Sequence, residues 1–468
     1  MSPTHQPEPT EPTLSEQTLV SEPESLEQDA PATAATEAQA QADSDNSRLL
    51  ARKSVSEFRT HLAKVSRSVD ASVVRRRPTW TPAYHAATYG LNTFFHVMKD
   101  NVITGRSLMA LGQLPKPVHV GIKKVLIPRR TDLLPFGMDV ADAQGSITAE
   151  WIDSALSVDE SKPSERVILY AHGGVYIGGS RKTHRQVTWR LAKYANARVL
   201  SIEYRLAPEN KFPLALHDML SCYLYLIDPP AGSKAVKYRP DQIVFSGDSS
   251  GGNLCLVSSL FLRDNNPTIP QPAGLALLSP WLDVTHSSPS FVLNAQYDIL
   301  PTKTEDKRHM SEDEGQYFVP SHMDLQDPMI SPLFSKEDVN ATNQLPPMLM
   351  QVGDAERLRD ETIILFQEQY PNSKIRVEVY EDMVHTFHLF ALAQPIAQFS
   401  LHNIAEFVKQ VTSTANGEPF ERRIVRVNNA DKKQKEDRFE IVDFEPVDQF
   451  LHEERVKAAE LLMKDLMK

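Results

Sequence analysis

A serine flanked by glycines is the feature of this sequence whose chemistry is easiest to interpret. Ser249 lies in G-D-S-S-G-G at 247–252, two residues after one glycine and two residues before another. The apolar run at 243–245 suits a buried strand, and a helical pattern covers 253–262. A strand that turns sharply into a helix holds a serine in a strained turn, where small neighbours avoid steric clashes. This order of elements predicts that Ser249 is a nucleophile presented at the end of a strand.

Two glycines upstream match the need of such a nucleophile for backbone N–H donors. Gly173 and Gly174 follow a second buried-strand pattern at 167–171. Acyl-transfer sites aim N–H groups at the oxygen on which negative charge develops, and glycine lets the backbone approach closely. The N–H of Ser250, directly after the nucleophile, is a further donor in this arrangement. These three residues are the candidate oxyanion hole.

A histidine downstream is the candidate general base. His385 follows an alternating strand pattern at 375–380, in the loop-like segment E-D-M-V-H. A serine hydrolase needs an imidazole that takes the proton of the serine and an acid that stabilises the imidazolium. In one fold that presents its serine in this way, the chain order is serine, acid, histidine. The sequence therefore predicts an acid between Ser249 and His385.

Seven short motifs support this interpretation together. They follow one another across residues 117–412: A-H-G-G-V-Y at 171–176, E-Y-R-L-A-P-E at 203–209, G-D-S-S-G-G at 247–252, S-P-W-L-D at 279–283, D-P-M-I-S-P-L at 327–333, L-P-P-M-L-M-Q-V-G-D at 345–354 and D-M-V-H-T-F at 382–387. With these motifs the chain resembles the hormone-sensitive lipase family of esterases, which have the α/β-hydrolase fold. The resemblance implies that Ser249 is the nucleophile and His385 the base. It implies the same oxyanion hole, Gly173, Gly174 and Ser250, and neither a metal ion nor a cofactor.

The acid of the site is open between two carboxylates. The family pattern has an acidic residue two positions before a leucine, and L-R-D-E at 358–361 sets a register that puts Glu356 at the acidic position. Asp354 lies two residues earlier and is the alternative. We expect Asp360 in the first turn of the next helix. Val175 stands where many relatives have a third glycine, which implies an altered pocket shape.

Eight strand patterns alternate with helical patterns along the core of the chain. They lie at 123–127, 148–152, 167–171, 199–204, 243–246, 275–278, 348–352 and 376–380. Such alternation predicts an α/β fold with a mainly parallel sheet and helices on both faces. The polar segment 285–325 interrupts the alternation, and the resemblance implies part of a helical cap there.

Charge distinguishes the two ends of the chain from its core. The 468 residues carry a net charge of −11, but 1–50 hold ten acidic residues and one basic residue, whereas 51–130 hold fifteen basic and three acidic residues. The patterns predict four parts: a disordered acidic tail at 1–47, a basic helical cap segment at 48–116, the catalytic domain at 117–412 and a charged extension at 413–468 that ends in a helix.

The basic segment has two interpretations. Trp80 and Tyr84, after the run of arginines at 75–77, suit a cap that packs on the core. They also suit a patch that contacts an intracellular membrane or a lipid droplet. Nucleic acid is not an expected partner, because no supporting fold is visible. Two cysteines, no signal-peptide pattern and no apolar run of ~20 residues predict a cytoplasmic enzyme.

The sequence as a whole predicts a carboxylesterase. The resemblance implies short-chain acyl esters as substrates, among them acetylated sterols or other lipids and aryl esters. Two alternatives stay open: a non-catalytic small-molecule-binding protein on the same fold, and a lipase or scaffold at a lipid surface. The presence of His385 argues against the first, since a binding protein has no need of a general base.

Overall fold

The computed structural model describes part of the chain. The described residues are 76–100, 105–106, 109, 113, 117–159, 162–300, 317–413, 420–429 and 439–466. The predicted acidic tail lies outside them. So do residues 48–75 of the basic segment and residues 301–316 of the expected cap insertion.

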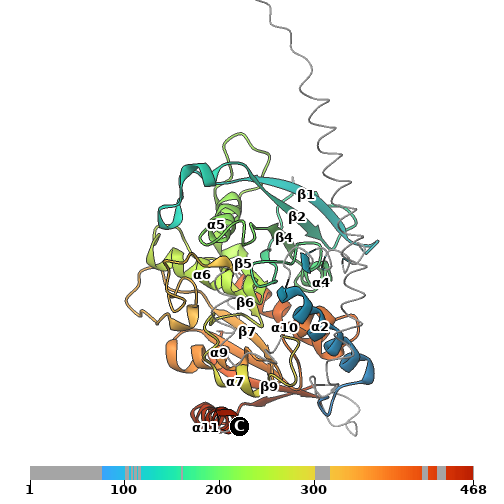
Figure 1. Ribbon diagram of the computed structural model, residues 1–468. Coiled ribbons are helices and arrows are strands. Elements are labelled where there is room, and N and C mark those ends of the chain that lie inside the picture. Colours follow the sequence, from blue (N-terminus) through green and yellow to red (C-terminus); the bar gives the residue numbers. More distant parts are fainter. Residues whose placement is uncertain are drawn as a thin grey trace, which may run out of the picture. The chain divides into compact units, whose positions relative to one another are not determined.

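The described strands form one sheet (Figure 1), in the order β1-β2-β4-β3-β5-β6-β7-β8-β9-β10. They are β1 (Gly121–Pro128), β2 (Ser146–Asp153), β3 (Val167–Ala171), β4 (Arg198–Glu203), β5 (Ile243–Asp248), β6 (Gly274–Leu278), β7 (Met348–Gly353), β8 (Ile375–Tyr380), β9 (Arg423–Asn429) and β10 (Phe439–Asp443). β2 pairs antiparallel with β1 and with β4, and β10 pairs antiparallel with β9; every other neighbouring pair is parallel. The predicted α/β class with a mainly parallel sheet is therefore confirmed.

Two strands lie beyond the eight predicted core strands: β9 was not predicted from the sequence, whereas residues 441–444 suit a short strand and overlap β10. β9 and β10 lie in the C-terminal extension, and β9 adds to the sheet beside β8. Its sequence R-I-V-R-V-N-N buries Val425 and Val427, leaves Arg426 between them partly exposed and leaves Arg423 exposed. That alternation is a strand pattern, but the charged residues around it made the segment resemble a linker.

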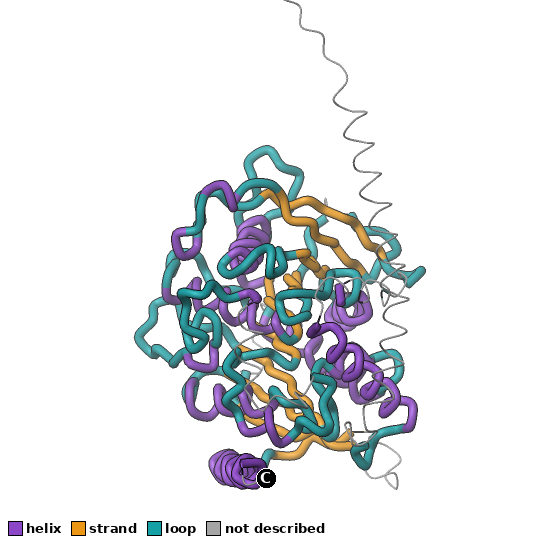
Figure 2. The backbone as a smooth tube through the Cα atoms, in the orientation of Figure 1, coloured by secondary structure: helices purple, strands orange, loops and turns teal. Residues whose placement is uncertain are grey.

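Helices cover both faces of the sheet, and Figure 2 shows the strands as one layer between them. α4 (Arg185–Ala195) and α10 (Pro395–Val411) pack against each other and share one apolar core. α5 (Leu214–Ile227), α6 (Ser250–Asp264) and α9 (Arg359–Ile364) contribute to the other. As predicted, Asp360 lies in the first turn of α9.

The remaining helical elements are short or lie at the two ends of the described chain. They are α2 (Pro82–Asp100), α7 (Pro289–Leu293), α11 (Val447–Leu466), the π-helical turn η5 (Leu365–Gln369) and the 3-10 turns η1 (Pro135–Gly137), η2 (Val140–Ala143), η3 (Pro240–Gln242), η4 (Pro332–Phe334) and η6 (Phe387–Phe390). α11 packs against α7 and α9 and buries Leu451, so the predicted C-terminal helix contacts the core.

The aromatic residues of the basic segment are buried. Trp80 is 1% exposed and Tyr84 is 3% exposed. The Trp80 indole N–H donates to the backbone oxygen of Asp382, and the Tyr84 hydroxyl lies 3.7 Å from the sulfur of Met383. These two rings therefore pack on the core and do not face a lipid surface. Residues 51–75, which the lipid interpretation also used, lie outside the described residues.

Candidate active site

Ser249 occupies the turn between β5 and α6. Its backbone has φ 53° and ψ −121°, a conformation that residues with a side chain rarely adopt. Glycines on either side permit this turn, because a Cβ at Gly247 or Gly251 would collide with the backbone oxygen of Ala171 on β3. The strained elbow thus rests directly on the neighbouring strand. It presents Ser249 at the carboxyl end of the sheet.

His385 lies beside the serine. Its Nε2 is 3.0 Å from Ser249 Oγ, the distance of a hydrogen bond. It follows β8, whose carboxyl end lies at the same sheet edge as that of β5. Burial lowers the pKa of His385 to about 4, so the imidazole is neutral near pH 7. Its other nitrogen, Nδ1, is buried and has no hydrogen-bond partner among the described residues.

Glu356 is the buried carboxylate after β7. One oxygen, Oε2, accepts hydrogen bonds from Ser279 Oγ at 2.7 Å and from the Gly353 N–H at 3.0 Å. The other, Oε1, is buried and has no partner within the described part of the chain. Burial raises the pKa of Glu356 to about 8, and the charge of Asp298 adds to the rise. An acceptor without a donor on Glu356 and an unpaired ring nitrogen on His385 are complementary.

Two residues that the sequence analysis missed join the acid loop to the histidine loop. Asp298 accepts the N–H of His385 at 2.9 Å with one oxygen and the N–H of Arg357 at 2.8 Å with the other. Ser279 donates to Glu356 and accepts the N–H of Thr386 at 3.1 Å. Ser279 is the first residue of the motif S-P-W-L-D. Asp298 belongs to no motif, because only the fold brings it between the two loops.

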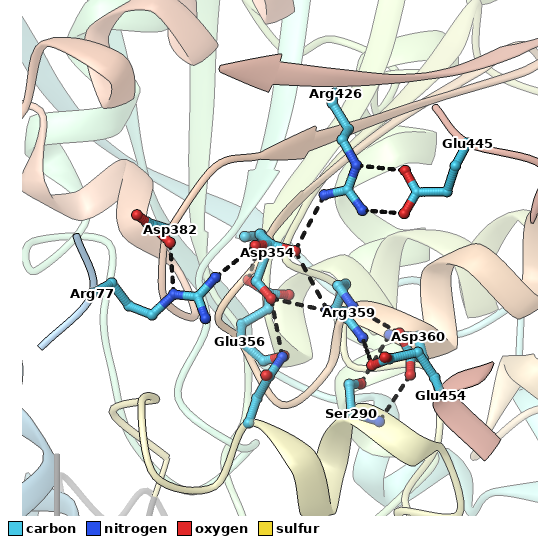
Figure 3. A network of polar contacts seen from close by, with 12 residues as sticks. Arg77, Ser290, Asp354, Glu356, Arg359, Asp360, Asp382, Arg426, Glu445 and Glu454 are labelled. Carbon is cyan, nitrogen blue, oxygen red and sulfur yellow. Dashed lines mark hydrogen bonds and ion pairs between the residues drawn. The ribbon is translucent and has the colours of Figure 1, made fainter. Parts of the chain in front are cut away.

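Asp354, the alternative acid, has other partners (Figure 3). Its carboxylate lies 2.9 Å from Arg77 and 3.4 Å from both Arg359 and Arg426. These arginines come from the N-terminal segment, from α9 and from β9. Both of its oxygens are therefore occupied by cations and not by the imidazole.

The loop at 172–176 after β3, here called the glycine loop, has N–H groups that are bonded within the protein and N–H groups without an acceptor in the described part of the chain. The Gly173 N–H donates to Asp248 Oδ1 at 3.1 Å, which takes it away from the oxyanion role expected for it. The N–H groups of Gly174 and Val175 have no hydrogen-bond acceptor among the described residues. Gly174 has φ 126° and Val175 has φ 57°. The Ser250 N–H is at the first position of α6, where no intrahelical acceptor exists.

Asp248, directly before the nucleophile, holds this loop in place. It accepts from Tyr170 at 2.6 Å and lies 3.1 Å from His184 Nε2, in addition to its bond with Gly173. Burial opposes its ionisation, but the pKa of Asp248 is lowered to about 2 by the charge and hydrogen bond of His184 and by the hydroxyl of Tyr170. Asp248 is thus an ionised anchor beneath the glycine loop.

A narrow apolar hollow adjoins the glycine loop. Tyr176 from the loop and Leu254 from α6 stand in its wall, and its nine lining residues are Tyr176, Asn210, Phe212, Ala215, Leu216, Leu254, Val257, Phe318 and Met329. Among the described residues, no group of three His, Cys, Asp or Glu side chains is placed to hold a metal ion. No described helix is long and apolar enough to cross a membrane.

Known proteins are similar to this chain in sequence and in fold. A family model described as the alpha/beta hydrolase fold matches residues 168–389. An esterase of Acinetobacter venetianus is 33% identical over 244 residues, which cover 52% of this chain and 74% of that protein. The chain belongs to the hormone-sensitive lipase family of α/β-hydrolases. It is a carboxylesterase- or lipase-type hydrolase.

Further relatives agree with this assignment. An acetyl-hydrolase of Streptomyces hygroscopicus is 30% identical, over 57% of this chain and 81% of its own length. The crystal structure of an esterase from the bacterial hormone-sensitive lipase family superposes with a TM-score of 0.54 at 28% identity, covering 69% of this chain and 98% of that one. The family model stops at residue 389, so β9, β10 and α11 lie beyond the part that it matches.

Proposed function

We propose that the chain hydrolyses carboxylic esters through a covalent acyl-enzyme on Ser249, with His385 as general base and Glu356 as the acid of the triad. The observation that carries this proposal is the 3.0 Å approach of His385 Nε2 to Ser249 Oγ on a strained strand-to-helix turn. A packing serine needs neither the strain nor a neutral buried imidazole. A serine nucleophile needs the neutral imidazole as its base, and in this fold the strained turn presents its hydroxyl.

The reaction follows from these positions. His385 takes the Oγ proton while the oxygen of Ser249 attacks the ester carbonyl, and a tetrahedral intermediate forms. His385 then gives this proton to the alcohol oxygen, the C–O bond to the alcohol breaks, and the acyl group stays on Ser249. Water, deprotonated by His385, attacks the acyl carbon; the bond to Ser249 Oγ then breaks, His385 returns the proton to this oxygen, and the carboxylic acid leaves.

The oxyanion of the tetrahedral intermediate is assigned to three N–H groups. They belong to Gly174, Val175 and Ser250, and Gly173 supports the loop through its bond to Asp248. The assignment replaces Gly173 of the sequence analysis with Val175. It needs only the backbone of residue 175, so the missing third glycine leaves the donor in place.

Glu356 suits the triad better than Asp354, because one oxygen of Glu356 has no partner among the described residues, whereas both oxygens of Asp354 are paired with arginines. A buried imidazolium and a buried carboxylate are each unfavourable alone, as the low pKa of His385 and the raised pKa of Glu356 indicate. Together they neutralise one another at the moment when His385 takes the serine proton. The stabilisation therefore acts in the transition state, where it accelerates the reaction.

Short acyl esters are the proposed substrates. The apolar hollow beside the glycine loop is narrow, and Phe212, Phe318 and Met329 are among its lining residues. The name acetyl-hydrolase of one relative agrees with a small acyl group. The alcohol part of the substrate is a phenol in aryl esters and a lipid hydroxyl in acetylated lipids, and the proposal includes both.

A p-nitrophenyl ester series from acetate to palmitate tests the proposal. We expect the wild type to have its highest kcat/KM at short chains, and Ser249→Ala to have none above background. An optimum at long chains would contradict the short-acyl assignment. A folded wild type without turnover on any ester would contradict the esterase itself and leave the binding-protein alternative.

A further inference from the structure

One arginine from outside the family core bridges the two catalytic loops. Arg77 Nη2 lies 2.9 Å from Asp354 Oδ2, and Arg77 Nε lies 2.6 Å from Asp382 Oδ1. Asp354 stands two residues before Glu356 on the loop after β7, and Asp382 stands three residues before His385 on the loop after β8. A single side chain thus holds both loops that supply the partners of the serine.

The segment around Arg77 binds the histidine loop at further points. Thr79 donates to Asp382 Oδ2 through its N–H at 3.2 Å and through its hydroxyl at 2.9 Å. The Trp80 indole donates to the Asp382 backbone oxygen. Asp382 has φ 56°, a conformation that few non-glycine residues adopt without support. The N-terminal segment supplies that support.

The C-terminal extension reaches the same carboxylate from another side, as Figure 3 shows. Arg426 on β9 lies 3.4 Å from Asp354 and pairs with Glu445 at 2.6 Å. Arg359 on α9 lies 3.4 Å from Asp354 and also pairs with Glu454 on α11. Segments from both ends of the chain therefore converge on Asp354.

We propose that Arg77 is a positioning residue of the esterase, which sets the acid loop against the histidine loop through Asp354 and Asp382. The inference rests on the proposed triad and extends the working site beyond the matched residues 168–389. The guanidinium suits this task because its N–H groups form a rigid fork that reaches two carboxylates at once, whereas an ammonium is a single point charge. Small errors in loop position cost turnover, because the acid must stay beside the imidazole that it stabilises.

The test compares Arg77→Gln, Arg77→Lys and the wild type on p-nitrophenyl acetate. We expect Arg77→Gln to lower kcat about 10–100-fold with KM within about twofold, because in the proposal Arg77 positions the loops and does not bind the ester. Arg77→Lys should recover part of the loss, because it keeps the charge but reaches one carboxylate.

Arg130→Gln is the matched control. Arg130 is 24% exposed, against 25% for Arg77, and it also joins two carboxylates, Asp132 and Asp228, away from the catalytic loops. Its kcat should equal that of the wild type. An equal loss in both variants would show a general effect of removing an ion pair and would overturn the proposal.

A second arm separates positioning from simple stabilisation. In a Glu356→Gln background the acid no longer acts, so Arg77→Gln should lower kcat by less than about twofold further. A full additional loss would mean that Arg77 does not act through the triad. If the wild type is active and Arg77→Gln has the same kcat, the positioning role of Arg77 would also be refuted. An inactive wild type would refute the proposed function instead. If Arg77→Gln does not fold, Arg77→Lys is put through the same cycle and judged by the same outcomes.

Discussion

At the residue scale, the site depends on two buried groups that carry opposite charges when each is ionised. Burial favours neutral His385, and it favours neutral Glu356 as well. In the proposed mechanism, proton transfer from Ser249 creates an imidazolium, and the unpaired oxygen of Glu356 is assigned to stabilise it. Asp354, by contrast, is already neutralised by arginines.

Substitution of each acid distinguishes the two carboxylates. Glu356→Gln should lower kcat by about 10³–10⁴-fold, because an amide neither stabilises the imidazolium nor selects its tautomer. Asp354→Asn should lower kcat only about 10–100-fold, through loop position. Steady-state kinetics on p-nitrophenyl acetate measures both. The reverse order of effects would make Asp354 the acid.

The acidity of His385 predicts the pH dependence of the reaction. The general base acts when neutral, and burial lowers its pKa from the usual 6.5 to about 4. Activity is therefore lost as pH falls through the lowered pKa and is present above it. A profile of kcat/KM against pH should have its acidic limb below pH 6.5. A limb near pH 7 or above would mean that a group other than His385, such as Glu356 with its raised pKa, controls the reaction.

The residues of the site differ in how far the sequence could predict them. Ser249, His385 and Glu356 stand at motif positions, and those assignments remain predictions with geometric support. The donor Val175 was missed because the motif shows which residues form the loop but not that Gly173 bonds to Asp248. Asp298 and Arg77 lie far along the chain from the loops that they hold, so only folding brings them there.

At the element scale, the C-terminal extension is part of the sheet. The predicted core strands are all present: apolar runs identify the buried strands β3 to β8, while β1 and β2 form an antiparallel pair at one edge of the sheet. β9 was not predicted, because only alternate residues of the strand are buried and charged residues surround them in the sequence. Its pairing with β8 stabilises the strand that leads to His385.

A charge placed in β9 tests its contribution. Val427→Asp puts a carboxylate at a fully buried position and should lower the free energy of unfolding by about 3–5 kcal/mol. Asn428→Asp, on the partly exposed face of the same strand, is the control and should change it by less than about 0.5 kcal/mol. Urea denaturation gives both values. Equal stabilities would mean that β9 does not pack on the core in solution.

At the scale of the whole molecule, segments from both ends of the chain are tied to the catalytic loops. Arg77 and Thr79 bind Asp382, while β9 and α11 reach the acid loop through Arg426 and Arg359. The working enzyme therefore extends past the family model at both ends.

Two N-terminal deletions locate where this dependence begins. A chain that starts at residue 76 keeps Arg77, Thr79 and Trp80 and should retain the wild-type kcat. A chain that starts at residue 82 lacks all three and should lose at least about 10-fold in kcat. Turnover of p-nitrophenyl acetate by both chains, with circular dichroism as the folding control, measures the difference. Equal activity of the two chains would mean that residues 76–81 do not contribute to catalysis.

The central claim is that Ser249 is a nucleophile activated by His385, and covalent trapping tests it most directly. Diethyl p-nitrophenyl phosphate should release one p-nitrophenolate per chain and leave one diethylphosphoryl group on the peptide that contains Ser249, as located by mass spectrometry. His385→Ala should react far more slowly. A label on another residue, or no label on a folded chain, would contradict the account.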